Sequence, residues 1–414
     1  KKPEETMPGR ARDRARSRRG VSGSVLAEFD FTTQSAGAAS LPSGLTFARA
    51  SSGYTVQTGT STLTTTGVTS DNVARVGKLA DAHSNGIFIE PARTNLYGYS
   101  RSANLASGTA GHSCTYTTGR TGPDGGTSAI RGQTPSGGYS RFQTLAPVTG
   151  NHTLSTWAAA GLGSGAYQVV GAYTGTTGAA VRGTASAAWG RVASAAFDYP
   201  AASSPTVNPW DGRANATLGS SAGARDCDLD FVQFEAGKYA TSAIVTSGGS
   251  TATRAAEILT VNGAVTSPVA RQGRLGCYLR FRAIAARSAL TAASEGNLFT
   301  DADGDWYVWV NGSNGLVEIG KGDTSKLSAS ASNAITWSAG DLVEIAAQFG
   351  NGKSRLRYRI NVGTATDISF SAQDDTFGAL AAANGIYVCS DGTTYHTPSV
   401  VEKVVLYLPG RSVF

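Results

Sequence analysis

The sequence has little cysteine, methionine and charge, and it contains no long apolar run. Its 414 residues include 4 Cys and 1 Met, and charged residues make up 15%. Four cysteines without a C-x-x-C pair exclude a disulfide-dense scaffold and the common zinc-ligand spacings. No apolar stretch approaches the roughly 18 to 20 residues of a membrane-spanning helix, so we expect no membrane insertion.

The residues that usually mark an active site are also scarce. The 4 His residues are His83, His112, His152 and His396, and none stands at a spacing typical of metal ligands. The chain has neither a G-x-S-x-G elbow nor a P-loop. We therefore expect no enzymatic activity. Because a glycosidase needs only two carboxylates, a polysaccharide depolymerase is kept as an alternative.

Glycine is abundant, and alanine, serine and threonine surround it. The chain has 52 Gly and 13 Pro. Gly and β-branched residues both weaken helices, while turns need Gly. Short segments of alternating polarity, such as 25–31 and 274–283, recur between clusters of Gly, Pro, Asn and Ser. This pattern predicts an all-β fold of tandem antiparallel β-sandwich or jelly-roll domains.

Composition and turn signals divide the chain into four parts. Residues 1–22 form a basic tail, and residues 23–103 form an N-terminal β module. Residues 104–261 form a jelly roll, and residues 262–414 form a second sandwich. The chain shows no exact repeat of about 20 to 50 residues, which argues against a propeller or a solenoid.

The basic character of the chain lies in its first 20 residues. They carry eight Lys/Arg and three Asp/Glu, which accounts for five of the six net positive charges. A charged segment without apolar periodicity cannot form a core, so we expect it to be disordered unless it is bound. It could dock on an acidic partner, with nucleic acid as a weaker alternative and a solvated end as the simplest interpretation. The anchoring residues would be Arg10, Arg12, Arg14, Arg16, Arg18 and Arg19.

The four cysteines fall two to each large predicted domain, as Cys114 with Cys227 and Cys277 with Cys389. Terminal strands of a jelly roll often lie side by side, so one disulfide bridge within each domain is geometrically possible. No apolar stretch follows the N-terminal charges, so no secretory signal is visible. We therefore expect reduced, buried thiols.

Two segments resemble a known family. GIFIEPARTNLYGYS (86–100) and FVQFEAGKYATSAIVTSGGSTATRAAEILTV (231–261) resemble a module of bacteriophage head-spike and tail-fibre proteins. In that family the first segment precedes a carbohydrate-binding-like jelly roll and the second closes it. Residues 335–349 and 401–413 resemble the concanavalin/laminin-G-like sandwich that often follows. The residues that fit the closing pattern are Gln233, Glu235, Gly237, Thr241, Ser242, Ile244, Thr246, Thr253, Arg254, Ala255 and Ala256.

The resemblance implies a virion appendage, a head spike or fibre or else a tail fibre, that attaches to the host cell surface. Its expected partners are other virion proteins, reached through the N-terminal tail, and host surface polysaccharide. It implies a homo-oligomer, for which a trimer is the usual arrangement. A purely structural capsid decoration or tail connector without a ligand is the main alternative.

Within the two motif segments, oppositely charged residues lie close in sequence. Glu90 and Arg93 flank a Pro turn, and we expect them to pair and lock it. The same structural role is expected for Glu235 with Arg254 at the end of the jelly roll.

Sugar binding needs flat apolar rings for the pyranose face and polar groups for the hydroxyls. Trp210, in a Pro/Gly loop beside Asp211 and Arg213, is the strongest stacking candidate. Tyr139 and Tyr395 are weaker candidates. Trp157 and Trp189 are expected in the core, and of Trp306 and Trp309 one should be core and one exposed.

One acidic run has a spacing that can gather oxygens around calcium. Asp301, Asp303 and Asp305 follow a D-x-D-x-D pattern. The position of the Gly and the lack of a closing Glu exclude an EF-hand. Calcium is thus the one cofactor that we consider, and an acidic hairpin turn is the default interpretation.

Overall fold

The computed structural model describes residues 25–35, 37–38, 40–51, 53–57, 64–68, 72–77, 79, 84–101, 111–112, 114–140, 143–160, 166–174, 177–184, 189–210, 224–265, 275–290, 296–301, 306–321, 324–328, 334–349, 354–368, 370, 385–393 and 395–408. In these residues the protein is all-β, as its composition predicts. No helix in this part of the chain has the length and apolar character needed to cross a membrane. The tail 1–22 and its six arginines lie outside the described residues.

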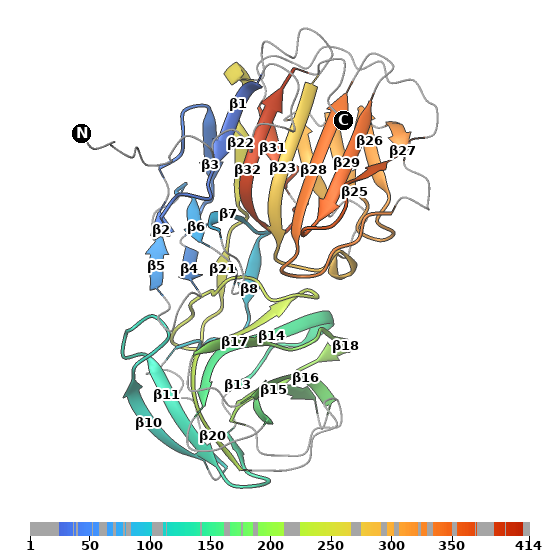
Figure 1. The fold of residues 1–414 in the computed structure, drawn as a ribbon. Coiled ribbons are helices and arrows are strands. Elements are labelled where there is room, and N and C mark those ends of the chain that lie inside the picture. The colour runs from blue at the N-terminus through green and yellow to red at the C-terminus, as the bar shows by residue number, and fades with distance from the viewer. Residues whose placement is uncertain are drawn as a thin grey trace, which may run out of the picture.

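The strands form two β-sandwiches, one above the other in Figure 1. The upper one contains both the early and the last described strands, and we call it the terminal sandwich. The lower one contains the middle of the chain, and we call it the inserted sandwich. Both sandwiches are antiparallel, and many neighbouring strands lie far apart in sequence, such as β7 (Gly86–Ile89) with β32 (Ser399–Tyr407) and β11 (Ala129–Thr134) with β20 (Arg225–Ala236).

The terminal sandwich has two sheets. Sheet 1 has the strand order β2 (Gly37–Ala38), β6 (Arg75–Gly77), β7 (Gly86–Ile89), β32 (Ser399–Tyr407), β23 (Leu275–Ala283), β28 (Leu342–Phe349), β29 (Arg355–Ile360) and β30 (Thr366–Ile368), with β1 (Val25–Asp30) also paired to β32. Sheet 2 has the order β27 (Thr324–Ser328), β26 (Val317–Lys321), β25 (Trp306–Val310), β24 (Asn297–Asp301), β31 (Ile386–Val388), β22 (Ile258–Val261) and β3 (Leu45–Ala48). A 3₁₀ turn, η1 (Arg287–Ala289), follows β23.

The inserted sandwich also has two sheets. Sheet 3 has the order β10 (Thr115–Arg120), β11 (Ala129–Thr134), β20 (Arg225–Ala236), β14 (Val148–Ala160) and β17 (Gly190–Ala193), with β18 (Phe197–Ser203) also paired to β14. Sheet 4 has the order β13 (Gln143–Thr144), β19 (Thr206–Pro209), β15 (Ala166–Thr174) and β16 (Thr177–Thr184). Small ladders pair β12 (Tyr139–Ser140) with β9 (Gly111–His112), β4 (Gly53–Gln57) with β5 (Thr64–Val68), and β21 (Ala252–Arg254) with β8 (Arg93–Asn95).

The strands of residues 23–103 pair differently from the separate module that the sequence predicts. β1 and β7 both pair with β32, and β3 pairs with β22. Phe29, Phe47 and Ile87 therefore lie in the same core as the C-terminal strands. The physical reason is size, since strands of two to six residues cannot bury a core by themselves. The second sandwich is thus completed by the N-terminal strands, and the jelly-roll region is inserted between them.

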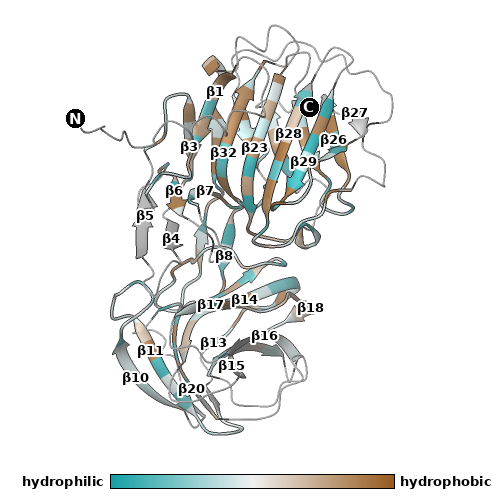
Figure 2. Cartoon of the chain, in the orientation of Figure 1, coloured by the Kyte–Doolittle hydropathy of each residue, from teal (hydrophilic) through white to brown (hydrophobic). Residues whose placement is uncertain are grey.

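Alternating polarity positions the core of the terminal sandwich. Along β23, Leu275, Leu279 and Phe281 face inward, whereas Tyr278 and Arg280 face outward. Figure 2 shows apolar and polar stretches along β23, β28 and β32. The inserted sandwich has its own core. Period two is therefore obeyed along β23, whereas β32 is buried almost throughout.

A buried ion network lies where the two sandwiches join, beside the β8–β21 ladder. Arg75 Nη2 lies 2.7 Å from Glu90 Oε2 and 2.5 Å from Glu257 Oε2. Arg49 Nη1 lies 3.0 Å from Glu257 Oε1, and Arg254 Nη1 lies 3.3 Å from Glu90 Oε2. All five side chains are buried. Burying charges is costly unless each is paired, and here each carboxylate faces two guanidinium groups.

The inserted sandwich contributes directly to this network. Ser242 N donates to Glu90 Oε1 at 2.8 Å, and Arg254 Nη1 donates to Ser242 O at 3.0 Å. Burial acts to raise the pKa of Glu90, but Arg254, Arg75 and Ser242 outweigh burial and bring this pKa down to about 2. Glu90 is therefore ionised in the folded protein near neutral pH. We call Arg49, Arg75, Glu90, Arg254 and Glu257 the junction network.

The two predicted short-range ion pairs are wrong, although their structural role is right. Arg93 does not reach Glu90; its guanidinium lies 5.1 Å from the centroid of the Tyr239 ring. Glu235 accepts from Thr241 N at 2.8 Å rather than pairing with Arg254. Arg93 Nη2 instead donates to the Tyr239 hydroxyl at 3.1 Å, and Glu90 pairs with Arg75 and Arg254.

The cysteines remain unbridged, in agreement with the sequence prediction. Cys227, Cys277 and Cys389 are buried and Cys114 is partly buried, all as free thiols. Burial raises the pKa of Cys114 to about 11 and that of Cys389 to about 12. These thiols are therefore protonated and unreactive near neutral pH.

Candidate functional site

Trp210, predicted as the main sugar-stacking residue, is fully buried. Its indole Nε1 donates to Cys227 O at 2.8 Å, and its ring contacts Gly132, where a Cβ would overlap it. It also lies 5.5 Å from the Tyr116 ring, centroid to centroid. Trp210 has φ +53° at the end of β19, and the ring fills the space that Gly132 leaves open. The prediction is wrong, and Trp210 is a core residue.

The neighbours predicted to assist Trp210 are not tested. Asp211 and Arg213 lie outside the described residues. Tyr139 lies in β12, where its backbone pairs with His112, but its side chain is outside the described part of the structure.

Tyr395 is at the surface, as a binding residue should be, with 37% of its area exposed. It stands in the turn 389–397 between β31 and β32. Asp391 Oδ1 accepts from Thr393 N at 2.8 Å and from Tyr395 N at 3.0 Å, and Asp391 N donates to Tyr395 O at 3.0 Å. These bonds hold the loop in a tight turn, so Tyr395 is presented from an ordered backbone.

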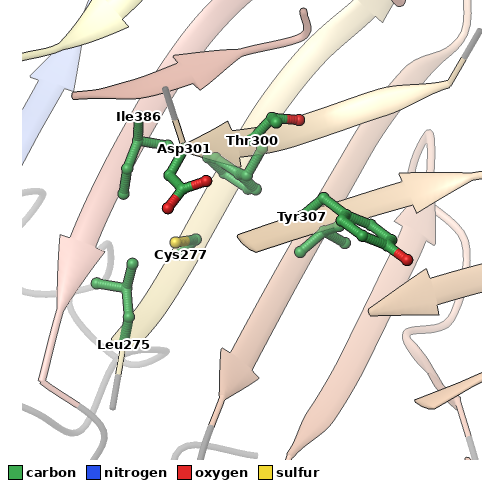
Figure 3. A pocket seen from close by; sticks show the side chains of 8 residues that line it. Leu275, Cys277, Thr300, Asp301, Tyr307 and Ile386 are labelled. Atoms are coloured by element: carbon green, nitrogen blue, oxygen red, sulfur yellow. The ribbon is translucent and has the colours of Figure 1, made fainter. Parts of the chain in front are cut away.

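Asp301, the first residue of the predicted calcium run, lies inside the terminal sandwich. It is the Cα partner of Ile386 and is buried. It lines a cavity of about 10 Å³ between the sheets, with Leu275 and Cys277 on the opposite side. Figure 3 shows its carboxyl group pointing toward Cys277. A cavity of this size is too small for a sugar ring, because it is about the volume that one water centre occupies.

The other two residues of the run, Asp303 and Asp305, lie outside the described residues. In the part that is described, no group of three or more His, Cys, Asp or Glu is arranged to hold a metal ion. Calcium therefore stays a prediction that rests on the sequence spacing, and the inward orientation of Asp301 does not support it.

The outer face of sheet 2 carries a cross-strand row of hydroxyl and aromatic side chains. Consecutive Cα partners run from β3 to β27 without interruption. The residues of this row are Thr46, Thr260, Tyr387, Thr300, Tyr307, Gly320 and Ser325. The adjacent row across the same sheet holds Asn297, Trp309, Glu318 and Ser328.

Alternation places the side chains of Tyr307 and Trp309 outward. Val308 and Val310 face the core of the terminal sandwich, so Tyr307 and Trp309 project from the opposite face of β25. Both aromatic side chains are partly exposed, and their ring centroids are 5.3 Å apart. Figure 3 shows the hydroxyls of Thr300 and Tyr307 pointing away from the interior cavity. We call Tyr307, Trp309, Tyr387, Thr300 and Glu318 the tyrosine face.

In the tyrosine face, the rings of Tyr307 and Tyr387 each pack against a glycine. A Cβ at Gly320 would overlap the ring of Tyr307, and a Cβ at Gly392 would overlap the ring of Tyr387. Gly392 has φ +83°, a conformation that glycine adopts without strain, so the turn that carries Tyr395 also fits against Tyr387. Partly exposed rings beside hydroxyls offer what sugar recognition needs, namely a flat apolar surface with polar groups at its rim.

The sequence reasoning found part of this face. It identified Trp309 as one of two tryptophans on opposite sides of a strand, and it missed Tyr307 and Tyr387. The alternation in WYVWV could have placed Tyr307 beside Trp309, because period two puts residues i and i+2 on one face. Tyr387 could not be found in this way, since strand order in sheet 2 brings it next to β24.

No protein-family model matches the chain, and no curated protein matches its sequence. Among solved structures, domain 4 of AbnA, a GH43 extracellular arabinanase from Geobacillus stearothermophilus in complex with arabinotriose, is 14% identical; the match covers 41% of this chain and 80% of that one, with a TM-score of 0.25. The receptor-binding domain of botulinum neurotoxin mosaic serotype C/D is 6% identical; the match covers 88% and 98%, with a TM-score of 0.15. With TM-scores this low, neither likeness bears on what this chain binds.

Proposed function

We propose that this protein is a non-enzymatic virion appendage, a head spike or fibre, that attaches to polysaccharide on the host cell surface. The observation that carries the binding part is the tyrosine face, where Tyr307, Trp309 and Tyr387 stand partly exposed among hydroxyl side chains. Aromatic rings stack on the C–H face of a pyranose, and hydroxyl and carboxylate groups bind its hydroxyls.

The charge distribution favours binding over cleavage. In the two cross-strand rows of sheet 2, Glu318 is the sole charged residue. Hydrolysis of a glycosidic bond by the common mechanisms needs a pair of carboxyl groups on either side of the bond. A depolymerase would have to place its second carboxylate elsewhere on the chain.

The virion part of the proposal rests on the resemblance of segments 86–100 and 231–261 to phage head-spike and tail-fibre proteins. The arginines of residues 1–22 are the proposed anchor to other virion proteins. The anchored protein is proposed to be a homo-oligomer, with a trimer favoured. Several copies on one particle raise avidity without a tight single site, so a shallow face is sufficient.

The test measures binding of the full purified chain to host cells and its competition with particle adsorption. Tyr307→Ala and Tyr387→Ala are compared with Tyr307→Phe and Tyr387→Phe, which keep the rings. Val362→Ala is the control, because Val362 is an apolar side chain of the terminal sandwich that is 99% exposed and lies outside the face. Loss of one stacking ring should weaken binding about tenfold, which corresponds to about 1.4 kcal/mol.

Other outcomes would assign the other functions. If folded, oligomeric wild-type protein neither binds cells nor slows adsorption, the protein is a structural decoration or connector. If the polysaccharide becomes shorter during incubation, the protein is a depolymerase.

A further inference from the structure

Two tyrosines of the tyrosine face lie in one cross-strand row with a single strand between them. Tyr387 is the Cα partner of Thr300, and Thr300 is the Cα partner of Tyr307. Because neighbouring strands are about 4.8 Å apart, the two tyrosines are about 10 Å apart across β24. Thr300 is buried on the strand between them, and its hydroxyl donates to Asn297 Oδ1 at 3.2 Å.

Glycine contacts help to place the rings of both tyrosines. Tyr307 is backed by Gly320, and Tyr387 is backed by Gly392. Tyr407 is seated on Gly276 in the same manner, but it is buried. Tyr307 and Tyr387 differ from Tyr407 in remaining partly exposed, so packing against glycine orients their rings without covering them.

The spacing matches an extended sugar chain. Neighbouring strands are ~4.8 Å apart. In a flat, β-linked pyranose chain the rings follow one another at a similar distance, and alternate rings turn the same face to one side. The first and third rings of such a chain can therefore stack on Tyr387 and Tyr307, with the second above Thr300. A helical, α-linked chain of the same sugar curves and cannot meet both rings.

The charge of the face selects among extended chains. Glu318 is the sole charged residue in the two rows, and Asp391 adds a carboxylate in the turn beside Tyr387. No Arg or Lys occurs in either row. Uronic-acid or phosphorylated chains would be repelled by the carboxylates, whereas neutral chains can donate hydroxyl hydrogen bonds to them.

We propose that the tyrosine face binds a neutral, extended, β-linked pyranose chain that runs across the strands of sheet 2, with alternate rings on Tyr387 and Tyr307. This inference rests on the proposed function and names its class of glycan. Trp309 widens the platform beside Tyr307.

The test is calorimetric titration of the full chain with defined oligosaccharides. Cellobiose, cellotriose and cellohexaose probe the length of an extended chain, and maltohexaose, which has the same sugar and a helical chain, is the matched control. Xylohexaose and mannohexaose, both β-1,4-linked, cover other neutral sugars. The third ring should raise affinity about tenfold over the disaccharide, and maltohexaose should bind at least about tenfold more weakly than the best extended hexamer.

Variants locate the two subsites. Tyr307→Ala and Tyr387→Ala should each weaken binding of the best extended hexamer about tenfold and remove the gain from the third ring. The Phe variants and Val362→Ala should bind as the wild type does. Equal affinity for maltohexaose, no gain at the third ring, or unchanged binding in both Ala variants with wild-type unfolding curves would each overturn the inference.

Host-cell binding separates this inference from the proposed function. Suppose that the wild-type protein binds host cells, that Tyr395→Ala abolishes this binding, and that Tyr307→Ala and Tyr387→Ala retain it. The attachment function then holds, and the tyrosine face is excluded as its site. If the protein binds host cells but none of the extended oligosaccharides, the proposed class of glycan is wrong and the attachment function holds. If wild-type protein binds neither cells nor oligosaccharides, both proposals fail.

Discussion

The junction network and the tyrosine face both gather polar and aromatic side chains, but they treat these groups in opposite ways. At the junction, Arg75, Glu90 and Glu257 are buried and paired in ion pairs of 2.5 to 2.7 Å. On the face, Tyr307 and Tyr387 keep part of their rings exposed. A buried charge without its partner destabilises the fold, whereas a partly exposed ring is free to bind.

The comparison separates the most recognisable sequence motif from the proposed binding face. The residues of segments 86–100 and 231–261 supply Glu90, Arg254 and Glu257 to the junction. The tyrosine face comes from strands that carry no such motif. We therefore expect substitutions at the junction to reduce stability and substitutions on the face to reduce binding.

Removing Arg75 should have the largest effect. Arg75→Met leaves Glu90 and Glu257 each without one buried partner, so unfolding free energy should fall by about 3–5 kcal/mol. Urea unfolding followed by tryptophan fluorescence measures it. Glu28→Ala is the control, because its pair with Lys403 at 2.5 Å is half-exposed and should contribute about 1 kcal/mol or less. Similar losses in the two variants would contradict the distinction between the regions.

Trp210→Ala should destabilise the protein by a comparable or smaller amount, about 3–5 kcal/mol, because it opens a cavity in the inserted sandwich. Glycan binding per folded molecule should stay unchanged. Calorimetric titration at a temperature where the variant is folded tests this. A selective loss of binding with wild-type stability would restore Trp210 as a ligand residue.

Acid should weaken the junction through Glu90. Its pKa is about 2 in the folded protein, below the ordinary value of 4.5, so its contribution is complete above pH of about 4.5. That contribution, about 3 kcal/mol, is lost as the pH falls toward about 2. Urea midpoints at pH 5 and pH 3 measure this loss. Glu90→Gln should be less stable at pH 5, and its stability should depend less on pH between pH 5 and pH 3. If its stability falls with pH as steeply as that of the wild type, Glu90 is not the source of the acid-induced loss.

Gly320→Ala should reduce binding without removing any ligand contact. The new Cβ would overlap the Tyr307 ring and displace it. The binding free energy for the glycan should therefore weaken by about 1 kcal/mol, which is a roughly fivefold loss of affinity. Gly190→Ala is the control, because its Cβ would meet open space. Unchanged affinity in the Gly320 variant would mean that the orientation of Tyr307 does not matter.

Tyr395→Ala should have the smallest effect, about twofold on glycan affinity, because Tyr395 lies in the turn bordering the face and outside its rows. The same calorimetric titration measures it. A loss larger than that of Tyr387→Ala would move the centre of the site from the sheet to the turn.

Much of the fold follows from local rules. Glycine-rich turns and period-two strands such as 274–283 predicted an all-β protein with two large sandwiches. The rules could not place β1, β3 and β7, because their partners β32 and β22 lie far away in sequence. The exposure of Trp210 was also mispredicted, since a loop tryptophan looks accessible until Gly132 of a distant strand is found beneath it.

The sequence by itself determined the strand character, the absence of the common catalytic motifs and the unbridged thiols. Each of these depends on neighbours a few residues apart. Only the tertiary structure decided that Glu90 pairs with Arg75 and Arg254, and that Tyr387 and Tyr307 share one row across β24. Both depend on strand order, and the pairing of strands distant in sequence is set by the burial of a common core rather than by any local pattern.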